Sequence, residues 1–241
     1  MCTVSFLSSH DQFFITSNRD ERTSRSASFE PVEETINNGK IIYPKDPKAG
    51  GTWFAINDNG QVCVLLNGAF EKHIPNKSYS RSRGLVLLDI IRASSPSFQL
   101  ETIDLNTIEP FTLIVYENRR LLEFRWDGDQ KYTKELDINK QYIWSSATLY
   151  SKEVMSIREA LFAEFLTQNN TIIASDIVDF HSNNHNDYEN GFVINREDSL
   201  KTLSITQAII AKDEIGLNHM DLLQNKEYFI SVATDHVSNQ S

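Results

Sequence analysis

The chain opens with a pattern that predicts a β-hairpin, and this hairpin constrains the rest of the fold. Thr3–Leu7 alternates between polar and apolar side chains, and Gln12–Thr16 is rich in residues that favour strands. A polar turn at Ser8–Asp11 joins the two stretches. The second stretch runs directly into the polar segment Ser17–Glu21, and an antiparallel hairpin brings that segment back towards residue 2. The sequence therefore predicts that the N-terminus and this segment share one site.

Two more hairpins are expected further along the chain. Thr52–Asn57 and Gln61–Leu66 flank Asp58-Asn59-Gly60, a strong hairpin-turn signal. The last five residues of the second stretch are all apolar, which is typical of a strand buried on both faces. Phe111–Tyr116 and Leu121–Trp126 form the third predicted hairpin.

Helices are predicted between these strands. After Ser82-Arg83-Gly84, one apolar helix face comprises Leu85, Leu88 and Ile91. Ser151 is expected to cap a second, amphipathic helix. Its apolar face comprises Val154, Ile157, Leu161, Phe162, Phe165 and Leu166. A shorter helix is expected at Ser175–His181.

The remaining segments complete a layered α+β pattern. Residues 22–50 are interpreted as a long covering loop and residues 182–190 as a polar loop. Leu203–Ala211 and Tyr228–Ala233 are predicted strands. Helices grouped between runs of antiparallel strands favour a single α+β domain over residues 1–241, and a four-layer αββα sandwich fits the order.

Charge and cysteine content narrow the partners and the compartment. Lys and Arg total 23 and Asp and Glu total 33, so the net charge of −10 disfavours nucleic acid. No apolar run approaches the roughly 20 residues of a membrane helix, and the opening lacks the basic region of a signal peptide. Two cysteines suit a reducing compartment. We expect a cytoplasmic protein that binds a small molecule, without membrane insertion; the oligomeric state is left open.

Cys2 is the first candidate catalytic residue. Removal of Met1 would leave a thiol and a free α-amine on the same residue. An α-amine has a pKa of roughly 7.7–8.0, so it can act as the base for its own side chain. The alternative is a small apolar residue that begins a buried strand.

Arg19, Asp20 and Asn67 are the other candidates for catalysis. Arg19 can lower the pKa of the Cys2 thiol, and Asp20 can orient the amine. Asn67 ends a buried strand, where its amide can donate to a developing oxyanion. The alternatives are a solvated turn with mutual salt bridges for the charged segment and a strand-ending turn for Asn67.

Other features carry weaker signals. Gly50-Gly51-Thr52-Trp53 allows a close backbone approach to a ligand or simply begins a strand, and Cys63 is expected in the core. The six histidines form no zinc signature, so we predict no metal site and no resident cofactor.

Several ordered blocks resemble the NRDE family, the transport and Golgi organisation protein 2 family. Its naming tetrad matches Asn18-Arg19-Asp20-Glu21, and the opening Met1–Phe6 is also similar. The other similar blocks are Tyr43–Asp46, Ala49–Trp53, Leu65–Gly68, Ser82–Leu85, Pro110-Phe111 and Leu203–Thr206.

This family in turn resembles the N-terminal nucleophile (Ntn) hydrolases, near choloylglycine hydrolases and penicillin V acylases. The resemblance implies the αββα sandwich, with Cys2 as nucleophile and with Arg19 and Asp20 holding its amine and thiolate. It also implies Asn67 in the oxyanion hole. By the same analogy we expect Asn18, Glu21 and Ser146 to contact the substrate.

The resemblance leaves two functions open. The first is an N-terminal cysteine amidohydrolase that acts on a small-molecule amide. The second is non-catalytic binding and transfer of haem, or of a lipid or acyl-CoA, with haem as cargo. The chain has Ser146 where the hydrolases carry a second Asn, and Thr202-Leu203-Ser204 without their Arg, which favours the second. A protein that uses the fold only for interaction is a third class.

Overall fold

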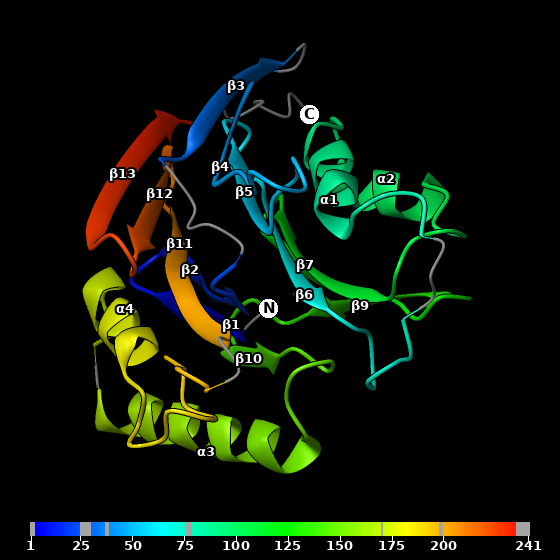
Figure 1. The fold of residues 1–241 in the computed structure, drawn as a ribbon. Helices are drawn as coiled ribbons and strands as arrows, with labels where there is room; N and C mark the ends of the chain where they lie inside the picture. Colours follow the sequence, from blue (N-terminus) through cyan, green and yellow to red (C-terminus); the bar gives the residue numbers. More distant parts are fainter. Residues whose placement is uncertain are drawn as a thin grey trace.

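Two antiparallel β-sheets lie face to face between two helical layers, as Figure 1 shows. The computed structural model describes residues 3–24, 30–36, 39–75, 79–169, 171–197 and 200–234. In these residues the first sheet has the order β10 (Tyr142–Ser145), β1 (Thr3–Ser9), β2 (Gln12–Arg22), β11 (Leu200–Ile210), β12 (Glu214–Asp221), β13 (Lys226–Ala233). The second has the order β3 (Val32–Ile36), β4 (Gly39–Tyr43), β5 (Phe54–Asn57), β6 (Val62–Asn67), β7 (Phe111–Glu117), β8 (Arg120–Trp126), β9 (Lys131–Leu136).

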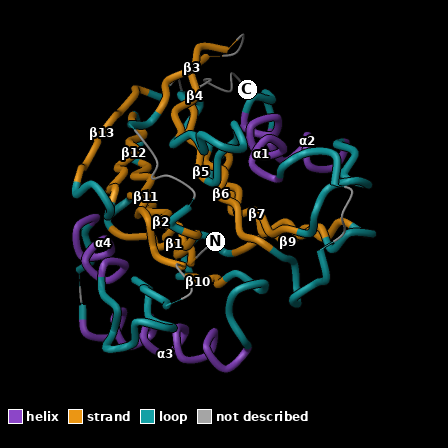
Figure 2. Tube along the Cα trace, in the orientation of Figure 1, coloured by secondary structure: helices purple, strands orange, loops and turns teal. Residues whose placement is uncertain are grey.

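Each sheet carries helices on its outer face only. The helices are α1 (Arg83–Ile91) and α2 (Pro96–Thr102) over the second sheet, and α3 (Lys152–Gln168) and α4 (Ala174–Ser182) over the first. Figure 2 shows the same arrangement, with helices outside and strands inside. The predicted four-layer αββα sandwich is therefore confirmed.

The β1–β2 hairpin forms as predicted, with a tighter turn and a longer second strand. Ser9 pairs with Gln12, and His10 and Asp11 both have positive φ, at 49° and 61°, as a two-residue turn of type I′ requires. β2 continues through Arg22, so the Asn18–Glu21 tetrad lies within a strand and not after one.

The core between the sheets follows the period of two of a β-strand. Val4, Phe6 and Ile15 of the first sheet are fully buried and pack with the second sheet. Their neighbours Leu7 and Phe14 face the helices instead. In the second sheet, every residue of the Val62–Leu66 run is buried, which confirms the prediction of a strand covered on both faces.

Some elements differ from the sequence-based expectations. The region expected to be a covering loop contains two strands, β3 and β4, because the pair forms the end of the second sheet. Strands β9, β10 and β12 and helix α2 were also not predicted.

Ser151 caps α3 as expected, with its Oγ accepting from the amide of Val154, but Ile157 is 60% exposed. The buried stripe runs instead through Arg158 and Phe162.

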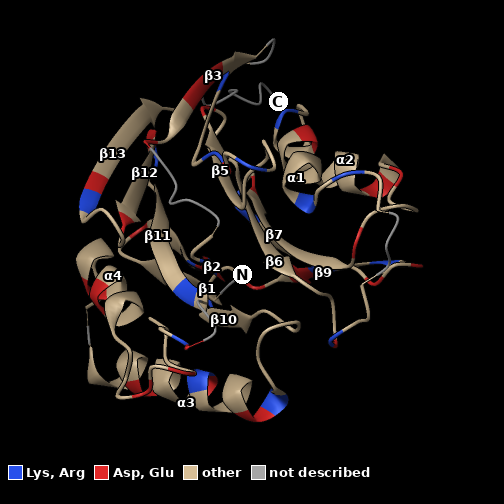
Figure 3. Ribbon diagram, in the orientation of Figure 1, with Lys and Arg blue, Asp and Glu red and all other residues tan. Residues whose placement is uncertain are grey.

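Charged positions are interspersed on the outer layers of the molecule. Acidic and basic positions alternate along α3 and lie around α1 and α2, as Figure 3 shows. Among the described residues, no helix combines the length and apolarity needed to cross a bilayer.

Two glycines of the similar blocks are explained by packing of the chain on itself. A Cβ on Gly51 would lie 2.4 Å from the carbonyl carbon of Gly84, and one on Gly84 would lie 2.7 Å from the carbonyl oxygen of Thr52. The amide of Thr52 donates to the carbonyl of Gly84 at 3.2 Å. The close approach therefore docks the beginning of α1 against the segment that leads into β5.

We predict that Gly51→Ala destabilises the fold by about 1–3 kcal/mol, because the methyl group must displace backbone. Gly216→Ala is the matched control, since its Cβ would meet the ring of Phe229, which is 61% exposed and free to move. Urea denaturation measures both variants. Equal losses in the two would contradict the packing argument.

Candidate active site

The candidate site lies where β1 begins and β10 and β6 end. Thr3 pairs with Asn18 on one side and with Ser145 on the other, so the start of the chain lies beside the tetrad as predicted. Asn67 comes from the opposite sheet, and its carbonyl accepts a hydrogen bond of 2.9 Å from Ser146 Oγ. Cys2, the predicted nucleophile, lies outside the described residues.

Arg19 is buried between the two sheets, and its partners come from the side of the second sheet. Its Nη2 donates to Asp46 Oδ2 at 2.8 Å, and the guanidinium lies 4.1 Å from the ring centroid of Trp53. The side chain is 1% exposed, and its Nε and Nη1 have no hydrogen-bond partner among the described residues. An arginine held in this way presents two N–H groups in fixed directions.

Asp46 is itself fixed by the loop that follows it. Its Oδ1 accepts from the amides of Lys48 and Ala49 at 2.9 and 3.0 Å. The loop closes at Gly50, whose φ of +71° suits glycine and whose amide donates to the carbonyl of Asp46. This loop therefore holds Asp46 in the position from which it binds Arg19, a role that the sequence did not reveal.

Asp20 faces the helical layer, on the side of β2 opposite to Arg19. Its carboxylate accepts from the Tyr150 hydroxyl at 2.6 Å and from Thr202 Oγ1 at 2.7 Å. Burial, together with the charge of Asp20, raises the pKa of Tyr150 well above its usual value. Arg19 and Asp20 therefore lie on opposite faces of β2, because successive residues of a strand point to opposite faces.

A β-bulge in β11 allows the hydroxyl groups of Thr202 and Thr206 to lie on opposite faces of the sheet. Thr202 pairs with Asp20 and Ser204 with Arg19, so Leu203 is an extra residue in the ladder. Thr202 bonds to Asp20 on the helix side. Further along β11, Thr206 lies between the sheets, where its Oγ1 is 2.8 Å from His219 Nδ1. The bulge thus supplies a partner for Asp20 while the rest of β11 keeps its inward face.

Arg158 of α3 ties the helical layer to the beginning of β1. It is fully buried, bonds to Thr3 Oγ1 and to the carbonyl of Gly191, and lies 3.6 Å from the ring centroid of Tyr150. Its spacing of four from Phe162 places it on the buried stripe of α3. An arginine on an apolar stripe is the signal that could have identified it.

Asn18, one of the residues expected to contact the substrate, lies under the helical layer and is hydrogen-bonded within the protein. Its Nδ2 donates to the carbonyls of His181 and Phe192 at 2.9 Å each, and its Oδ1 lies against His181 Nδ1. His181 Nε2 is 2.7 Å from Ser5 Oγ. These contacts fix the tautomer: Nδ1 donates to Asn18, and Nε2 accepts from Ser5. The polar atoms of Asn18 are all used within the protein.

The other predicted site residues lie near the same strand ends. Ser146 Oγ is engaged by the Asn67 carbonyl and lies 3.1 Å from Thr148 Oγ1. Asn67 Oδ1 is buried without a partner in the described part of the chain. Glu21 pairs with Lys201 at the edge of the site, and its Oε1 accepts from the amide of Arg22.

A cluster of buried polar groups lies between the sheets around Arg19. Within the described ranges, the atoms of this cluster that lack a hydrogen-bond partner are Ser17 Oγ, Trp53 Nε1, Ser204 Oγ and Asp221 Oδ2. Buried polar atoms are nearly always paired in proteins, so this concentration indicates a functional site. The sequence analysis named the segments that contain Ser17, Trp53 and Ser204 but not their grouping around Arg19. This grouping forms only when β2, β11 and β12 pair and the second sheet brings Trp53 against Arg19.

Two cavities adjoin the site. A cavity of about 140 Å³ is lined by Asp46, Trp53 and Leu65, among others. A larger one, of about 380 Å³, lies along the segment that follows Ser146 and includes Phe70 and Tyr150 in its wall. In the described ranges, no group of three or more His, Cys, Asp and Glu side chains is arranged to hold a metal ion.

Comparison with known proteins supports the family and the fold. The sequence model of a family described as Transport and Golgi organisation 2 matches residues 1–227. No curated protein matches the chain in sequence.

Three solved structures resemble the fold at low sequence identity. The C2A mutant of conjugated bile acid hydrolase from Clostridium perfringens is 11% identical, with a TM-score of 0.53 over 95% of this chain and 96% of that one. Another variant of the same hydrolase gives 11% and 0.55, over 95% and 92%. The N-acylethanolamine-hydrolyzing acid amidase ortholog of Caenorhabditis elegans gives 10% and 0.60, over 86% and 92%. The fold is therefore that of the Ntn hydrolases.

Two buried histidines predict a loss of stability in mild acid. Burial, with the charges of Arg158 and His185, lowers the pKa of His181 to about 3, and burial with the charge of Arg19 lowers that of His219 to about 4. Below about pH 6.5 the unfolded chain therefore takes up protons that the folded chain does not. Stability should fall as pH drops from about 6.5 towards these values, by up to about 1.4 kcal/mol per pH unit for each histidine.

Urea denaturation at several pH values in this window measures the slope. The variants His181→Gln and His219→Gln should each flatten it relative to the parent, since carboxylates contribute equally to all three proteins. An unchanged slope in both variants would contradict the assignment.

Proposed function

The chain belongs to the Transport and Golgi organisation 2 family, and we propose that it is an amide hydrolase with Cys2 as its nucleophile. The observation that carries the proposal is the buried Arg19, whose two N–H groups have no partner among the described residues beside the start of β1. The Ntn-hydrolase fold supports it, because the solved relatives named above include a bile acid hydrolase and an acid amidase.

The proposal requires Cys2 to face the space between the sheets. Val4 and Phe6, two and four residues further along β1, face that space. Arg19 follows Asn18 on β2 and so lies one step beyond Thr3↔Asn18, the last described pair of the two strands. A thiolate on Cys2 would receive the charge of Arg19, which favours the ionised form.

The reaction needs removal of Met1 and then two steps. The α-amine of Cys2 takes the thiol proton, and the sulfur bonds to the substrate's carbonyl carbon. The oxyanion that forms is stabilised by N–H donors, for which Arg19 and the Asn67 side chain are the candidates. The C–N bond then breaks, and the amine leaves with the proton. Water hydrolyses the thioester, releases the carboxylic acid and restores the thiol.

Residues on the helix side of β2 hold this machinery in position. Arg158 holds Thr3, while Tyr150 and Thr202 hold Asp20. The 380 Å³ cavity beside Ser146 gives space for a small substrate, and Phe70 in its wall suits an apolar group.

Transfer of haem or of a lipid remains the second candidate function. The engagement of Ser146 Oγ by the Asn67 carbonyl favours it, because that hydroxyl is occupied where related hydrolases place a catalytic amide. His181 and His219 are both fully buried and hydrogen-bonded, so neither offers an accessible ligand to haem iron. A haem titration with a saturable Soret shift would support this alternative.

We predict that Cys2 reacts with limiting iodoacetamide at least about tenfold faster than Cys63. Cys63 is the internal comparison, because burial raises the pKa of its thiol well above the usual value. Intact-protein mass spectrometry with mapping of the labelled residue measures both rates and the presence of Met1. Retention of Met1, or equal rates, would count against the hydrolase. On a panel of N-acyl amides, Cys2→Ala should lose turnover that Cys63→Ala retains.

We further predict that Arg19→Lys shifts the pH dependence of Cys2 alkylation to higher pH. Lysine keeps the positive charge but lacks the planar guanidinium that is held between Asp46 and Trp53. Its charge therefore stabilises the thiolate less. Arg22→Lys, on the same strand and exposed, is the matched control. Identical profiles for both variants would show that Arg19 does not act on the thiol.

A further inference from the structure

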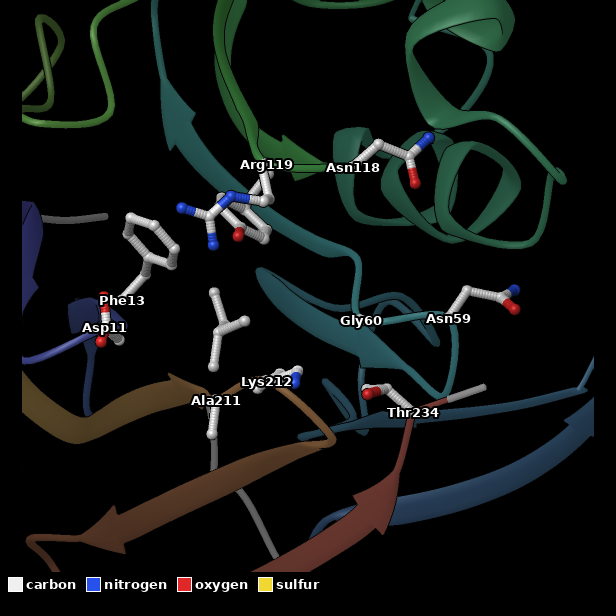
Figure 4. A pocket seen from close by; sticks show the side chains of 11 residues that line it. Asp11, Phe13, Asn59, Gly60, Asn118, Arg119, Ala211, Lys212 and Thr234 are labelled. Carbon is white, nitrogen blue, oxygen red and sulfur yellow. The ribbon is translucent and has the colours of Figure 1, made fainter. Parts of the chain in front are cut away.

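A third cavity lies at the end of the sandwich opposite the candidate active site. It measures about 580 Å³ and is bounded by the turns that join β1 to β2, β5 to β6, β7 to β8 and β11 to β12 (Figure 4). The candidate site lies at the other ends of β1, β6 and β11, about 20 Å away by the rise of a strand. A volume of this size is typical of sites for small organic ligands.

The floor of this cavity is apolar and joins the two sheets. Phe13 of β2 and Tyr116 of β7 pack with ring centroids 5.3 Å apart, and Ile210 of β11 adds an aliphatic surface. These three residues are 4%, 4% and 5% exposed, so the floor is part of the core and is rigid. A hydrocarbon or aromatic group placed here would be removed from water.

The rim carries two cations whose side chains are not otherwise engaged. Arg119 lies over the ring of Phe13 at 5.2 Å and points into the cavity (Figure 4). Neither Arg119 nor Lys212 forms a hydrogen bond or ion pair with any described residue. The adjacent Arg120, by contrast, is paired with Glu135 at 2.7 Å. Among the described residues of the lining, Asp11 is the one acidic side chain, so this part of the rim is positive in a chain of net charge −10.

The turn that directs Arg119 into the cavity has a backbone conformation that is unfavourable for arginine. Asn118 and Arg119 have φ of 50° and 57°, the left-handed conformation of a type I′ turn. Asn-Gly is the favoured pair there, and arginine rarely adopts this conformation. The sequence therefore keeps a long cation at a position that suits glycine.

We propose that this cavity binds an amphipathic carboxylate, with its apolar body on Phe13, Tyr116 and Ile210 and its carboxylate at Arg119 and Lys212. The Tyr116 hydroxyl adds a neutral donor, because burial raises the pKa of Tyr116 to about 12. The apolar floor selects the body of the ligand, and the unpaired guanidinium selects a planar anion that it can bind through two N–H groups.

Calorimetric titration with decanoate and decan-1-ol tests the proposal. The parent protein should bind decanoate more tightly than the alcohol. Arg119→Gln should weaken decanoate binding about tenfold, as expected for a lost charged hydrogen bond, and leave the alcohol unaffected. Arg120→Gln, on the same turn, is the matched control and should bind both ligands like the parent. Ala211→Phe should abolish binding of both, because Ala211 lines the cavity and a ring there would fill it.

Three outcomes would overturn the proposal. These are no saturable decanoate binding below about 1 mM, equal loss in Arg119→Gln and Arg120→Gln, or unchanged binding in Ala211→Phe. The last would place decanoate elsewhere, including the candidate active site. Cys2→Ala should keep the parent's affinity, so this test is independent of the proposed hydrolase activity.

Discussion

The candidate site depends on β2 being paired along both of its edges. Pairing with β1 places Thr3 opposite Asn18, and pairing with β11 covers the other edge as far as Arg22. A strand end would expose this charged segment to water, whereas a central strand buries it and fixes the direction of each side chain. The tetrad is therefore divided, with Arg19 between the sheets and with Asn18 and Asp20 under the helices.

Burial on both faces obliges each charged group to find partners, and those partners assemble the rest of the site. Arg19 is compensated by Asp46 and Trp53 from the second sheet, which locks the two sheets together at this end. Asp20 draws in Tyr150 and Thr202. A buried charge without such partners would destabilise the fold by several kcal/mol. The folded state therefore requires the hydrogen-bond network. The same network holds Arg19 in a fixed orientation, with its Nε and Nη1 unpaired among the described residues.

The sequence predicted what local patterns determine and missed what only tertiary pairing brings together. Alternation and turn residues sufficed for the β1–β2 hairpin and for the buried strand at Val62–Leu66, because both signals act over a few residues. The layered fold followed from the order of these elements. Arg158 was missed because the predicted apolar face placed Ile157 on the buried stripe, although Leu161, Phe162, Phe165 and Leu166 of that predicted face do pack on the core.

The partners of the tetrad could not be deduced in the same way. Asp46 and Trp53 stood in recognisable blocks, but nothing local states that they enclose Arg19. The placement of Thr202 depends on the bulge at Leu203, which no propensity indicates. Nor does any local pattern indicate that the side-chain amide of Asn18 is hydrogen-bonded to His181 of α4 and to Phe192. Arg19 and Phe13 lie six residues apart on the same face of β2, one at the candidate site and one in the floor of the third cavity, at the opposite end of the sandwich. The core between them is filled by buried side chains such as Val4, Phe6 and Ile15. Ligand binding at one end can affect the other end only if β2 shifts along its neighbours. Such a shift would break the hydrogen bonds that pair β2 with both β1 and β11. The two ends of the sandwich are therefore expected to act as separate sites that share a rigid strand.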